Sequence, residues 1–593
     1  MGEASTDTSL SGRPKRRLDS WKEIATHLKR DIATVQRWER REGMPVHRHV
    51  HEKRGSVYAY SWELDAWLQS RTPRLEEEEQ KHQAPVDAVS DHRSNQPGRV
   101  HPWLVLSSIA VLAIAGTIYL IRRSHAGNAT RSKITSVAVL PLENLSGDPM
   151  QEYFADGMTE AVIGRLSLIS GLRVISRTSV RRFKDTHMSV PEIAKSLRVD
   201  AIVEGSVIRE GGHVRVHAQL IRALTEEHFW SETYDRELRD VLSLQSEVAQ
   251  AIAEKVEVTV TGKERARLVA TRHVAPEVYE SYLKGEDQLG RNGKAEIEKS
   301  IAYFVEAIRK DPTFAPAYVG IANAYGALGM ILVGASPDET RPKEIQAARK
   351  ALELDPELAE AHAILADVYQ ERWQWKDAEA EYKRALELRP NDVAAHLGFA
   401  HWLLCQGRME EALEWSRRAR ELDPVEVRGV GTGWILFHAR RYDEAIRELR
   451  SAVAVHPDHA GARWFLGFAL IGKGLPQEAI PELEKTVSMT HRSPGSLELL
   501  ATAYASAGRR RQAIRLINEL KKRRQKSYVP AGAFINPYLA LRDYDEAFVW
   551  FERAYQEQSN ILQFLKVHPF FDPIRGDPRF KDLLRRVGLD QAR

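Results

Sequence analysis

DAEAEYKRALELRP, residues 377–390, is one unit of a pattern that recurs through the C-terminal half of this 593-residue sequence. Its first alanine recurs at spacings of 34, 33, 34, 34 and 34 residues, at Ala378, Ala412, Ala445, Ala479, Ala513 and Ala547. In the first three units a second alanine and then a proline follow, at Ala385, Ala419 and Ala452 and at Pro390, Pro424 and Pro457. A small residue suits a close helix crossing, and proline cannot continue a helix. The period therefore predicts stacked helix pairs.

This period and these residues resemble the tetratricopeptide repeat, a 34-residue helix–turn–helix unit. Glycines fall at the predicted turn inside a pair, at Gly407, Gly474 and Gly508. Alanine–proline pairs continue the array upstream, at Ala307 with Pro312 and at Ala351 with Pro356, with an insertion near 331–341. We expect about eight repeats over residues 275–590, the first two irregular. The resemblance implies a superhelix whose concave side holds a peptide or a protein.

Other features of the array are expected to be structural. Residues 467–473, GFALIGK, lack the Ser/Thr of a phosphate-binding loop, because Gly474 stands there. Cys405 is the only cysteine, so no internal disulfide can form, and it is expected to pack as a small hydrophobe. Six tryptophans are expected to pack between helices rather than to form an aromatic ligand cage: Trp373, Trp375, Trp402, Trp415, Trp434 and Trp464.

Residues 133–262 alternate strand-like and helical runs, which predicts a compact α/β domain. Its segments VAVLPLENLSGD, EYFADGMTEAVIGRLS, LRVISRTSV, VDAIVEGSVIREGGHVRVHAQL and FWSETYDREL resemble FlgO and the amino-terminal domain of TolB. That resemblance implies a domain of envelope proteins and signalling modules without catalysis. Asp148, Asp156 and Glu160 are expected to serve a turn and a helix surface rather than acid–base chemistry.

The N-terminal residues 18–71 predict a small winged helix-turn-helix. Between Arg13 and Arg54 there are 13 Lys/Arg against 6 Asp/Glu, a surplus of +7 that exceeds the net charge of +4 for the whole chain. Such a surplus indicates an anionic partner. The helix WKEIATHLKR is followed by Asp31, a good N-cap for IATVQRWERR. On that second helix the periodicity places Ala33, Gln36, Arg37 and Arg40 opposite the apolar side.

Residues 45–51 and 56–60 predict two strands around the turn EKRG. ATVQRWERREGMP and this hairpin resemble the MerR/excisionase-like DNA-binding domains, which implies that the second helix reads bases and the wing contacts phosphate. The candidate DNA-binding residues are Ala33, Thr34, Gln36, Arg37, Arg40, Arg48, Lys53 and Arg54. The alternative is that the arginines form a solvated face. His47, His49 and His51 alternate as metal ligands could, but phosphate contact or packing explains them, and neither a metal nor a cofactor is predicted.

Residues 102–121, PWLVLSSIAVLAIAGTIYLI, hold no charge and are long enough to cross a bilayer as a helix. The alternative is a buried core helix. With 72–101 as a flexible linker, the predicted fold class is multidomain: a small winged helix-turn-helix, one transmembrane helix, an α/β domain and an all-α tetratricopeptide solenoid. DNA binding would place the head in the cytoplasm and the C-terminal region outside it, whereas the charges flanking the span favour the reverse.

Together these features predict a single-pass regulator of transcription in the bacterial inner membrane, similar in layout to the ToxR/CadC type. Its expected partners are double-stranded DNA at the head, membrane lipid at 102–121, and a protein or peptide at the repeats. A homodimer is possible, because two paired heads would raise their effective concentration on DNA. The alternative is a membrane-tethered tetratricopeptide scaffold with no DNA role. No constellation of side chains supports an enzyme.

Overall fold

The computed structural model forms two compact units, Met1–Gly116 and Thr117–Arg593, which are considered separately below. The structure describes residues 17–18, 20–28, 30, 34–36, 38–39, 44–48, 57–61, 63–64, 67, 133–184, 186–270, 272–291, 293–329, 335–424 and 429–590.

The N-terminal unit has a three-stranded antiparallel sheet beside a short helix. Its described elements are β1 (Arg17–Leu18), α1 (Trp21–His27), β2 (His47–Arg48) and β3 (Val57–Tyr60). β3 lies between β1 and β2 and pairs His47 with Tyr58, so the predicted hairpin is present. Ser20 begins α1 by accepting a hydrogen bond from the Glu23 amide at 3.3 Å. Buried apolar side chains from all parts of the unit form its core, among them Leu18, Ile24, Val35, Ala59 and Leu64.

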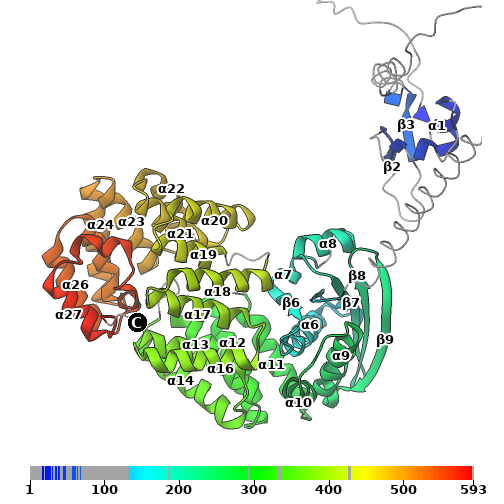
Figure 1. The fold of residues 1–593 in the computed structure, drawn as a ribbon, viewed down its shortest axis with the longest axis horizontal. Helices are drawn as coiled ribbons and strands as arrows, with labels where there is room; N and C mark the ends of the chain where they lie inside the picture. Colours follow the sequence, from blue (N-terminus) through cyan, green and yellow to red (C-terminus); the bar gives the residue numbers. More distant parts are fainter. Residues whose placement is uncertain are drawn as a thin grey trace, which may run out of the picture. The chain divides into compact units, whose positions relative to one another are not determined.

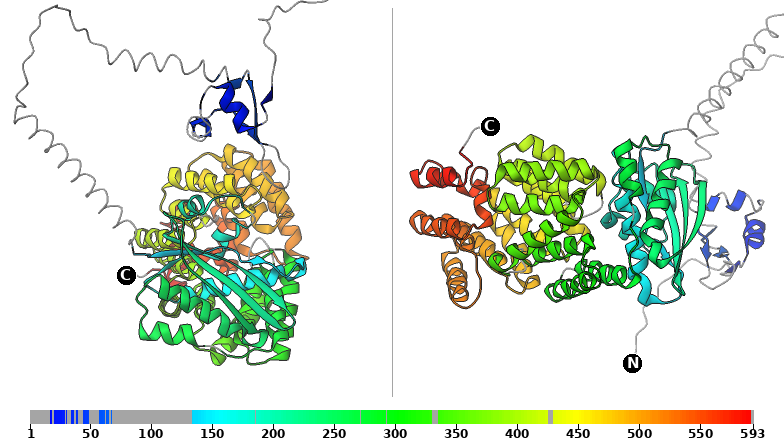
Figure 2. Two further views of the ribbon diagram at one scale, coloured as in Figure 1. Left: turned by 90° about the vertical axis from the view of Figure 1, so that its right-hand side faces the viewer. Right: turned by 90° about the horizontal axis from the view of Figure 1, so that it is seen from below.

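The second unit begins with an α/β domain. Its elements are β4 (Ser136–Val139), β5 (Glu143–Asn144), η1 (Pro149–Gln151), α6 (Glu152–Leu166), β6 (Arg173–Val174), α7 (Arg177–Arg181), α8 (Val190–Leu197), β7 (Ala201–Glu210), β8 (His213–Arg222), β9 (Glu227–Glu237), η2 (Leu238–Asp240), α9 (Val241–Lys255) and α10 (Gly262–Val269). The sheet order is β6-β4-β7-β8-β9, parallel among β6, β4 and β7 and antiparallel from β7 to β9. The long strands β7 to β9 form the edge far from the helix array (Figures 1 and 2).

Residue alternation on β8 and β9 shows that one sheet face is packed and the other is polar. Val214, Val216, Ala218 and Leu220 are buried, whereas Arg215 pairs with Asp235 across the strands at 2.7 Å. α9 packs against β8 and β9 and also against α6. Alternation of this kind is typical of antiparallel strands with one solvated face.

Eight helix pairs follow within the described part of the chain, each formed by neighbouring helices in contact. They are α11 (Pro276–Leu289) with α12 (Lys294–Lys310), α13 (Ala315–Gly329) with α14 (Pro337–Leu354), α15 (Ala359–Glu371) with α16 (Trp375–Leu388), α17 (Val393–Cys405) with α18 (Met409–Leu422), α19 (Gly429–His438) with α20 (Tyr442–Val455), α21 (Ala460–Gly472) with α22 (Pro476–Met489), α23 (Pro494–Ser506) with α24 (Arg510–Arg524), and η3 (Ala531–Phe534) and α25 (Ile535–Ala540) with α26 (Tyr544–Gln556). The turns η4 (Asn560–Phe564) and η5 (Pro569–Ile574) and helix α27 (Pro578–Arg586) end the described chain.

The repeated alanines lie where the period predicts, between the helices of a pair. Six of them have no exposed surface: Ala378, Ala412, Ala445, Ala479, Ala513 and Ala547. Glycine allows a second close approach between the helices of a pair. A Cβ on Gly467 of α21 would stand 2.6 Å from the Leu483 side chain of α22, so this helix crossing requires glycine. The short side chains therefore set the distance between helices in each pair.

The α/β domain and the first helix pair share one hydrophobic core. Phe154 of α6 meets Tyr279 of α11 with ring centroids 6.3 Å apart, and the Tyr279 hydroxyl accepts a hydrogen bond from Gln245 of α9 at 2.5 Å. Buried residues of this core extend from β4 to Phe314 and Ala317. The two parts are thus packed as one body rather than joined by a linker.

The predicted fold class and membrane location are contradicted by the structure. No helix among the described residues is long and apolar enough to cross a bilayer. The stretch 102–121, on which that prediction depended, lies outside the described residues, as does the predicted linker 72–101. The corrected fold is a mainly helical repeat array with a mixed-sheet domain.

Candidate functional site: the two surfaces of the repeat array

The inner side of the array is filled by part of the same chain. Residues 558–575, called here the C-terminal segment, contact side chains from helices α14, α15, α17, α19 and α21. Figure 1 shows the array curving so that its last helices, α26 and α27, return toward its earlier pairs. This is the surface that the repeat pattern assigned to a peptide.

Polar contacts hold one end of the C-terminal segment. Gln370 of α15 donates a hydrogen bond to the Gln563 side chain at 2.8 Å. Arg341 of α14 donates to the Asn560 amide oxygen at 2.7 Å and pairs with Glu371 at 2.9 Å. Gln370 and Gln563 are both buried, so this hydrogen bond gives a partner to the Gln370 amide nitrogen and to the Gln563 amide oxygen where water is excluded.

Aromatic rings hold the middle of the C-terminal segment. The Phe564 ring centroid lies 5.0 Å from that of His438, 5.1 Å from that of His401 and 5.4 Å from that of Trp434. His568 follows four residues later and stacks on Phe571 at 4.7 Å. Aromatic packing of this kind adds about 0.5–1.5 kcal/mol per pair beyond the area it buries.

Burial keeps the histidines of this contact neutral. Burial, together with the neighbouring Arg575, lowers the pKa of His568 from 6.5 to about 3. The pKa of His438 is likewise well below its usual value because of burial and the nearby His568. Both side chains are almost completely buried, so a charge on either one would lack solvent.

An ion pair and ring contacts close the far end of the inner side. Arg440 binds both carboxylate oxygens of Asp572, at 2.6 and 3.1 Å. Trp373 stacks on Tyr555 at 5.3 Å, and the Trp375 indole donates a hydrogen bond to the Val587 carbonyl at 2.8 Å. The inner side of these repeats is therefore already occupied.

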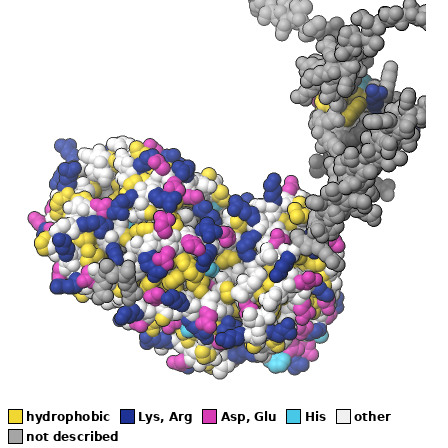
Figure 3. All heavy atoms as spheres, viewed as in Figure 1, with side chains coloured by type: hydrophobic (Ala, Val, Ile, Leu, Met, Phe, Trp, Pro, Cys, Tyr) yellow, Lys and Arg dark blue, Asp and Glu magenta, His cyan; other side chains and the backbone are white. Residues whose placement is uncertain are grey.

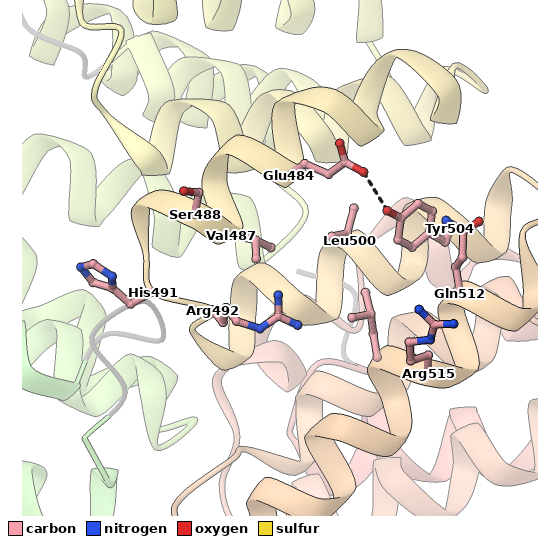
Figure 4. A pocket seen from close by; sticks show the side chains of 10 residues that line it. Glu484, Val487, Ser488, His491, Arg492, Leu500, Tyr504, Gln512 and Arg515 are labelled. Carbon is pink, nitrogen blue, oxygen red and sulfur yellow. Dashed lines mark hydrogen bonds between the residues drawn. The ribbon is translucent and has the colours of Figure 1, made fainter.

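A groove on another face of the array is open. It is a cavity of about 790 Å³ lined by Glu484, Val487, Ser488, His491, Arg492, Leu500, Tyr504, Gln512, Arg515 and Leu516 (Figure 4). α22 and α24 supply its walls and α23 supplies Leu500 and Tyr504. The Tyr504 hydroxyl donates a hydrogen bond to Glu484 at 2.8 Å. Burial and this carboxylate raise the pKa of Tyr504 to about 12.

The α/β domain also docks on the middle of the array. The Asn391 side chain donates to the carbonyls of Ile169 and Leu172 at 3.0 and 2.9 Å. The Ser176 amide donates to the Leu422 carbonyl at 2.9 Å, and the Ser179 hydroxyl donates to Asp423. These contacts fix the β6 edge of the sheet on the loops that follow α16 and α18.

Most of the predicted DNA-binding residues lie outside the described residues. That group comprises Ala33, Arg37, Arg40, Lys53 and Arg54. Thr34 and Gln36 lie in a helical turn and are half-buried, and between them Val35 is fully buried. Arg48 lies on β2 opposite Val57. Of the predicted set, the structure therefore describes only the turn that holds Thr34 and Gln36 and the strand that holds Arg48.

Among the residues considered as metal ligands or as acid–base groups, those that the structure describes form ordinary structural contacts. His47 binds Glu63 at 2.8 Å and stacks on Tyr58 at 5.1 Å, while His49 and His51 lie outside the described residues. No group of three or more His, Cys, Asp or Glu in the described ranges could hold a metal ion. Asp148 caps η1, Asp156 pairs with Lys184 at 2.7 Å and Glu160 with Arg177 at 2.5 Å.

The prediction of tetratricopeptide repeats is confirmed, and the tryptophans, Cys405 and residues 467–473 have structural surroundings within them. The six tryptophans pack between helices; for example, the Trp402 indole donates to the Trp375 carbonyl at 3.0 Å, and that of Trp464 to the Gly495 carbonyl at 3.0 Å. Cys405 is buried and near Gln563. Residues 467–472 are part of α21, not a loop between strand and helix.

Sequence reasoning missed the C-terminal segment and the groove. The signal for the former is the aromatic density of NILQFLKVHPFFDPI, residues 560–574, in a part of the chain where the repeat period stops. The signal for the groove is the run RRRQAIRLINELKKRR, residues 509–524, in which cations far outnumber carboxylates.

Comparisons with known proteins identify the parts of the second unit. Residues 132–251 match the HilA/YgeH-like transcriptional regulator, second domain. Residues 365–426 and 431–496 match the tetratricopeptide repeat. The chain therefore carries a HilA/YgeH-like regulator domain and a tetratricopeptide array. This combination indicates a regulator-like role with protein interaction. Three resemblances stay predictions: that of the head to MerR/excisionase domains, that of the α/β domain to FlgO and TolB, and that of the layout to ToxR/CadC.

Relatives match parts of the chain. The putative adenylate cyclase 3 of Rhizobium meliloti is 35% identical over 239 residues, which are 39% of this chain and 39% of that protein. The type IV pilus assembly protein PilF of Pseudomonas aeruginosa is 29% identical over 26% of this chain and half of its own length. The solved tetratricopeptide protein YrrB, described as having an unusual peptide-binding site, is 22% identical over 33% of this chain and 95% of its own, with a TM-score of 0.23. The chain thus spans half or less of the length of these two curated relatives.

Proposed function

We propose that this chain is a DNA-binding regulator of transcription whose tetratricopeptide array binds a protein partner. The observation that carries the proposal is the packing of the HilA/YgeH-like domain on the array. The two share a hydrophobic core at α11, and Asn391 and Asp423 of the array bind the domain at the β6 edge. A partner bound to the array would therefore act on a regulator domain that packs directly against the array, with no flexible linker between them.

DNA binding is assigned to the head. The surplus of +7 between Arg13 and Arg54 and the antiparallel hairpin β2–β3 support this assignment. Arg37 and Arg40 are proposed to contact the major groove together with Ala33, Thr34 and Gln36, and Arg48, Lys53 and Arg54 to contact phosphate. A single small head makes few contacts, so we propose that two chains pair on a site with two halves.

The test is the affinity of the full chain for duplex DNA over a range of salt concentrations. Each lost contact to a phosphate reduces the slope of log K against log salt by about 0.9. The double variant Arg37→Ala, Arg40→Ala removes two cations from the interface and is therefore expected to weaken binding and to flatten that slope.

A matched control removes two exposed cations from helix α10, with Lys263→Ala and Arg265→Ala. This control is expected to bind DNA as the parent does. DNA affinity that is unchanged in the head variant, or reduced equally in the control, would refute the assignment to the head.

A further inference from the structure

Helix α24 concentrates positive charge on the array. Its fifteen residues hold seven Lys/Arg and one Glu, a net +6 that exceeds the +4 of the whole chain. Lys521, Arg523 and Arg524 pair with carboxylates: Glu546, Glu519 and Glu557. Arg511 and Arg515 are exposed and one turn apart, and neither forms an ion pair within the described residues. On the face in Figure 3, by contrast, basic and acidic side chains are interspersed.

The open groove lies directly beside these cations. Arg515 lines it from α24 and Arg492 lines it from the end of α22, and Figure 4 shows both guanidinium groups directed into the space beside Leu500. Arg492 already binds Glu519 at 2.7 Å, so it is held in place at the rim. Exposed cations at a preorganised rim attract an anionic partner and orient it.

The floor of the groove is apolar. Val487, Leu500 and Leu516 line it and are almost completely buried. A phosphate backbone offers no apolar side chain for such a floor. A peptide that carries both carboxylates and an apolar side chain matches the rim and the floor together.

The inner side of the array does not compete for this role. Glu498 of α23 faces α25, where it accepts a hydrogen bond from Asn536 at 2.9 Å. Leu500 is two residues further along, about 200° around the helix, so it faces away from α25. The contacts of the C-terminal segment described above come from α14, α15, α17, α19 and α21, and none of them involves a residue that lines the groove.

We propose that the groove between α22 and α24 binds an acidic peptide segment of a protein partner, with an apolar side chain inserted over Leu500 between carboxylates held by Arg515 and Arg511. This inference names the chemistry of the partner in the proposed function and rests on the partner-binding half of it. It requires nothing of the head.

The experiment measures binding of a fluorescein-labelled synthetic peptide, EELEEFEELEE, to the full chain by fluorescence anisotropy at low salt. Arg511→Glu with Arg515→Glu reverses two exposed charges and is expected to weaken binding at least about tenfold. The control, Lys263→Glu with Arg265→Glu, makes the same change of charge on α10 and is expected to alter affinity less than about twofold.

Two further probes test the chemistry without touching the buried floor. A peptide with Glu replaced by Gln, and an all-Glu peptide without Leu and Phe, are each expected to bind at least about fivefold more weakly than the parent peptide. Absence of parent binding, equal loss in both protein variants, or equal binding of the all-Glu peptide would overturn the proposal. Duplex DNA that loses affinity through Arg511 and Arg515 while the peptide does not would assign the groove to nucleic acid instead.

The head variant Arg37→Ala, Arg40→Ala separates this proposal from the proposed function. It is expected to bind the peptide as the parent does. Peptide binding with no DNA binding would leave the groove assignment standing and refute the role of the head.

Discussion

At the scale of single residues, one backbone conformation recurs at the turn within six of the eight helix pairs. Trp373, Gly407, Arg440, Gly474, Gly508 and Arg542 all have positive φ, between 60° and 84°. Glycine adopts this conformation without cost, whereas other residues lose about 1–2 kcal/mol. The turn geometry is therefore a property of the repeat and not of the residue that occupies it.

Substitution of Gly508 tests this requirement. A Cβ at Gly508 would meet no atom within 4 Å, but φ is +75° there. Gly508→Ala is therefore expected to lower the free energy of unfolding by about 1–2 kcal/mol, measured by urea denaturation. Gly164 in α6 is the control, because it also has open space around it and lacks the positive φ. Gly164→Ala should stabilise the protein by up to about 1 kcal/mol, and destabilisation of both variants alike would contradict the account.

Glu498 is a buried carboxyl, and its titration makes a second prediction at this scale. Burial raises its pKa from 4.5 to about 8. Above pH 4.5 the Glu498 carboxyl ionises in the unfolded chain but keeps its proton in the folded chain. The free energy of unfolding therefore falls as pH rises from about 4.5 to about 8. Glu498→Gln cannot ionise and is expected to gain several kcal/mol relative to the parent at pH above 8, with little difference below 4.5. Glu410→Gln makes the same change at an exposed position and is the control in the same urea titrations.

The sequence could predict the alanine and glycine positions because they follow a period. It could not predict that Trp373, Arg440 and Arg542 share the turn conformation of the glycines, because their side chains carry no such signal. The buried state of Glu498 was also unpredictable, since its partner Asn536 lies 38 residues away.

At the scale of elements, the predicted alternation of strands and helices in residues 133–262 is present, because alternation and turn residues are local. β7 and β8, for example, are joined by a tight turn at Gly211 and Gly212. The C-terminal segment differs, because its turns η4 and η5 are fixed by contacts with helices more than a hundred residues earlier, such as that of Asp572 with Arg440.

The buried histidines give a prediction for this segment. The pKa values of His438 and His568 are lowered by burial, that of His568 to about 3. Below about 6.5 the unfolded chain binds protons that the folded chain excludes, so stability is lost as pH falls from about 6.5 toward about 3. His438→Phe keeps an aromatic ring beside Phe564 without a titrating group. It is expected to unfold at a lower pH than the parent in an acid titration followed by tryptophan fluorescence.

The control for this titration is His456→Phe, which makes the same change at an exposed position. An acid midpoint that moves equally in both variants, or that does not move in His438→Phe, would show that this histidine does not contribute to acid unfolding.

At the scale of the whole molecule, docking of the HilA/YgeH-like domain on the array is the feature that sequence did not reveal. Asn391 follows Pro390, a position that the repeat pattern assigns only to a helix handover, yet its side chain binds carbonyls of the domain.

Removal of the Asn391 side chain leaves the half-buried carbonyls of Ile169 and Leu172 without their hydrogen-bond donor. Asn391→Ala is expected to lower the free energy of unfolding by about 1–3 kcal/mol. It should also separate the thermal transition of the domain from that of the array in calorimetry. Asn518→Ala, at an exposed position on α24, is the control and should leave a transition like that of the parent. An unchanged transition in Asn391→Ala would show that docking does not depend on this residue.

The central claim is that this chain regulates transcription by binding DNA through its head. Chromatin immunoprecipitation of the full-length tagged protein, compared with Arg37→Ala, Arg40→Ala expressed at the same level, tests it most directly. The account predicts enrichment at discrete DNA loci for the parent and its loss in the variant. Equal enrichment for both proteins, or no enriched locus for either, would contradict it.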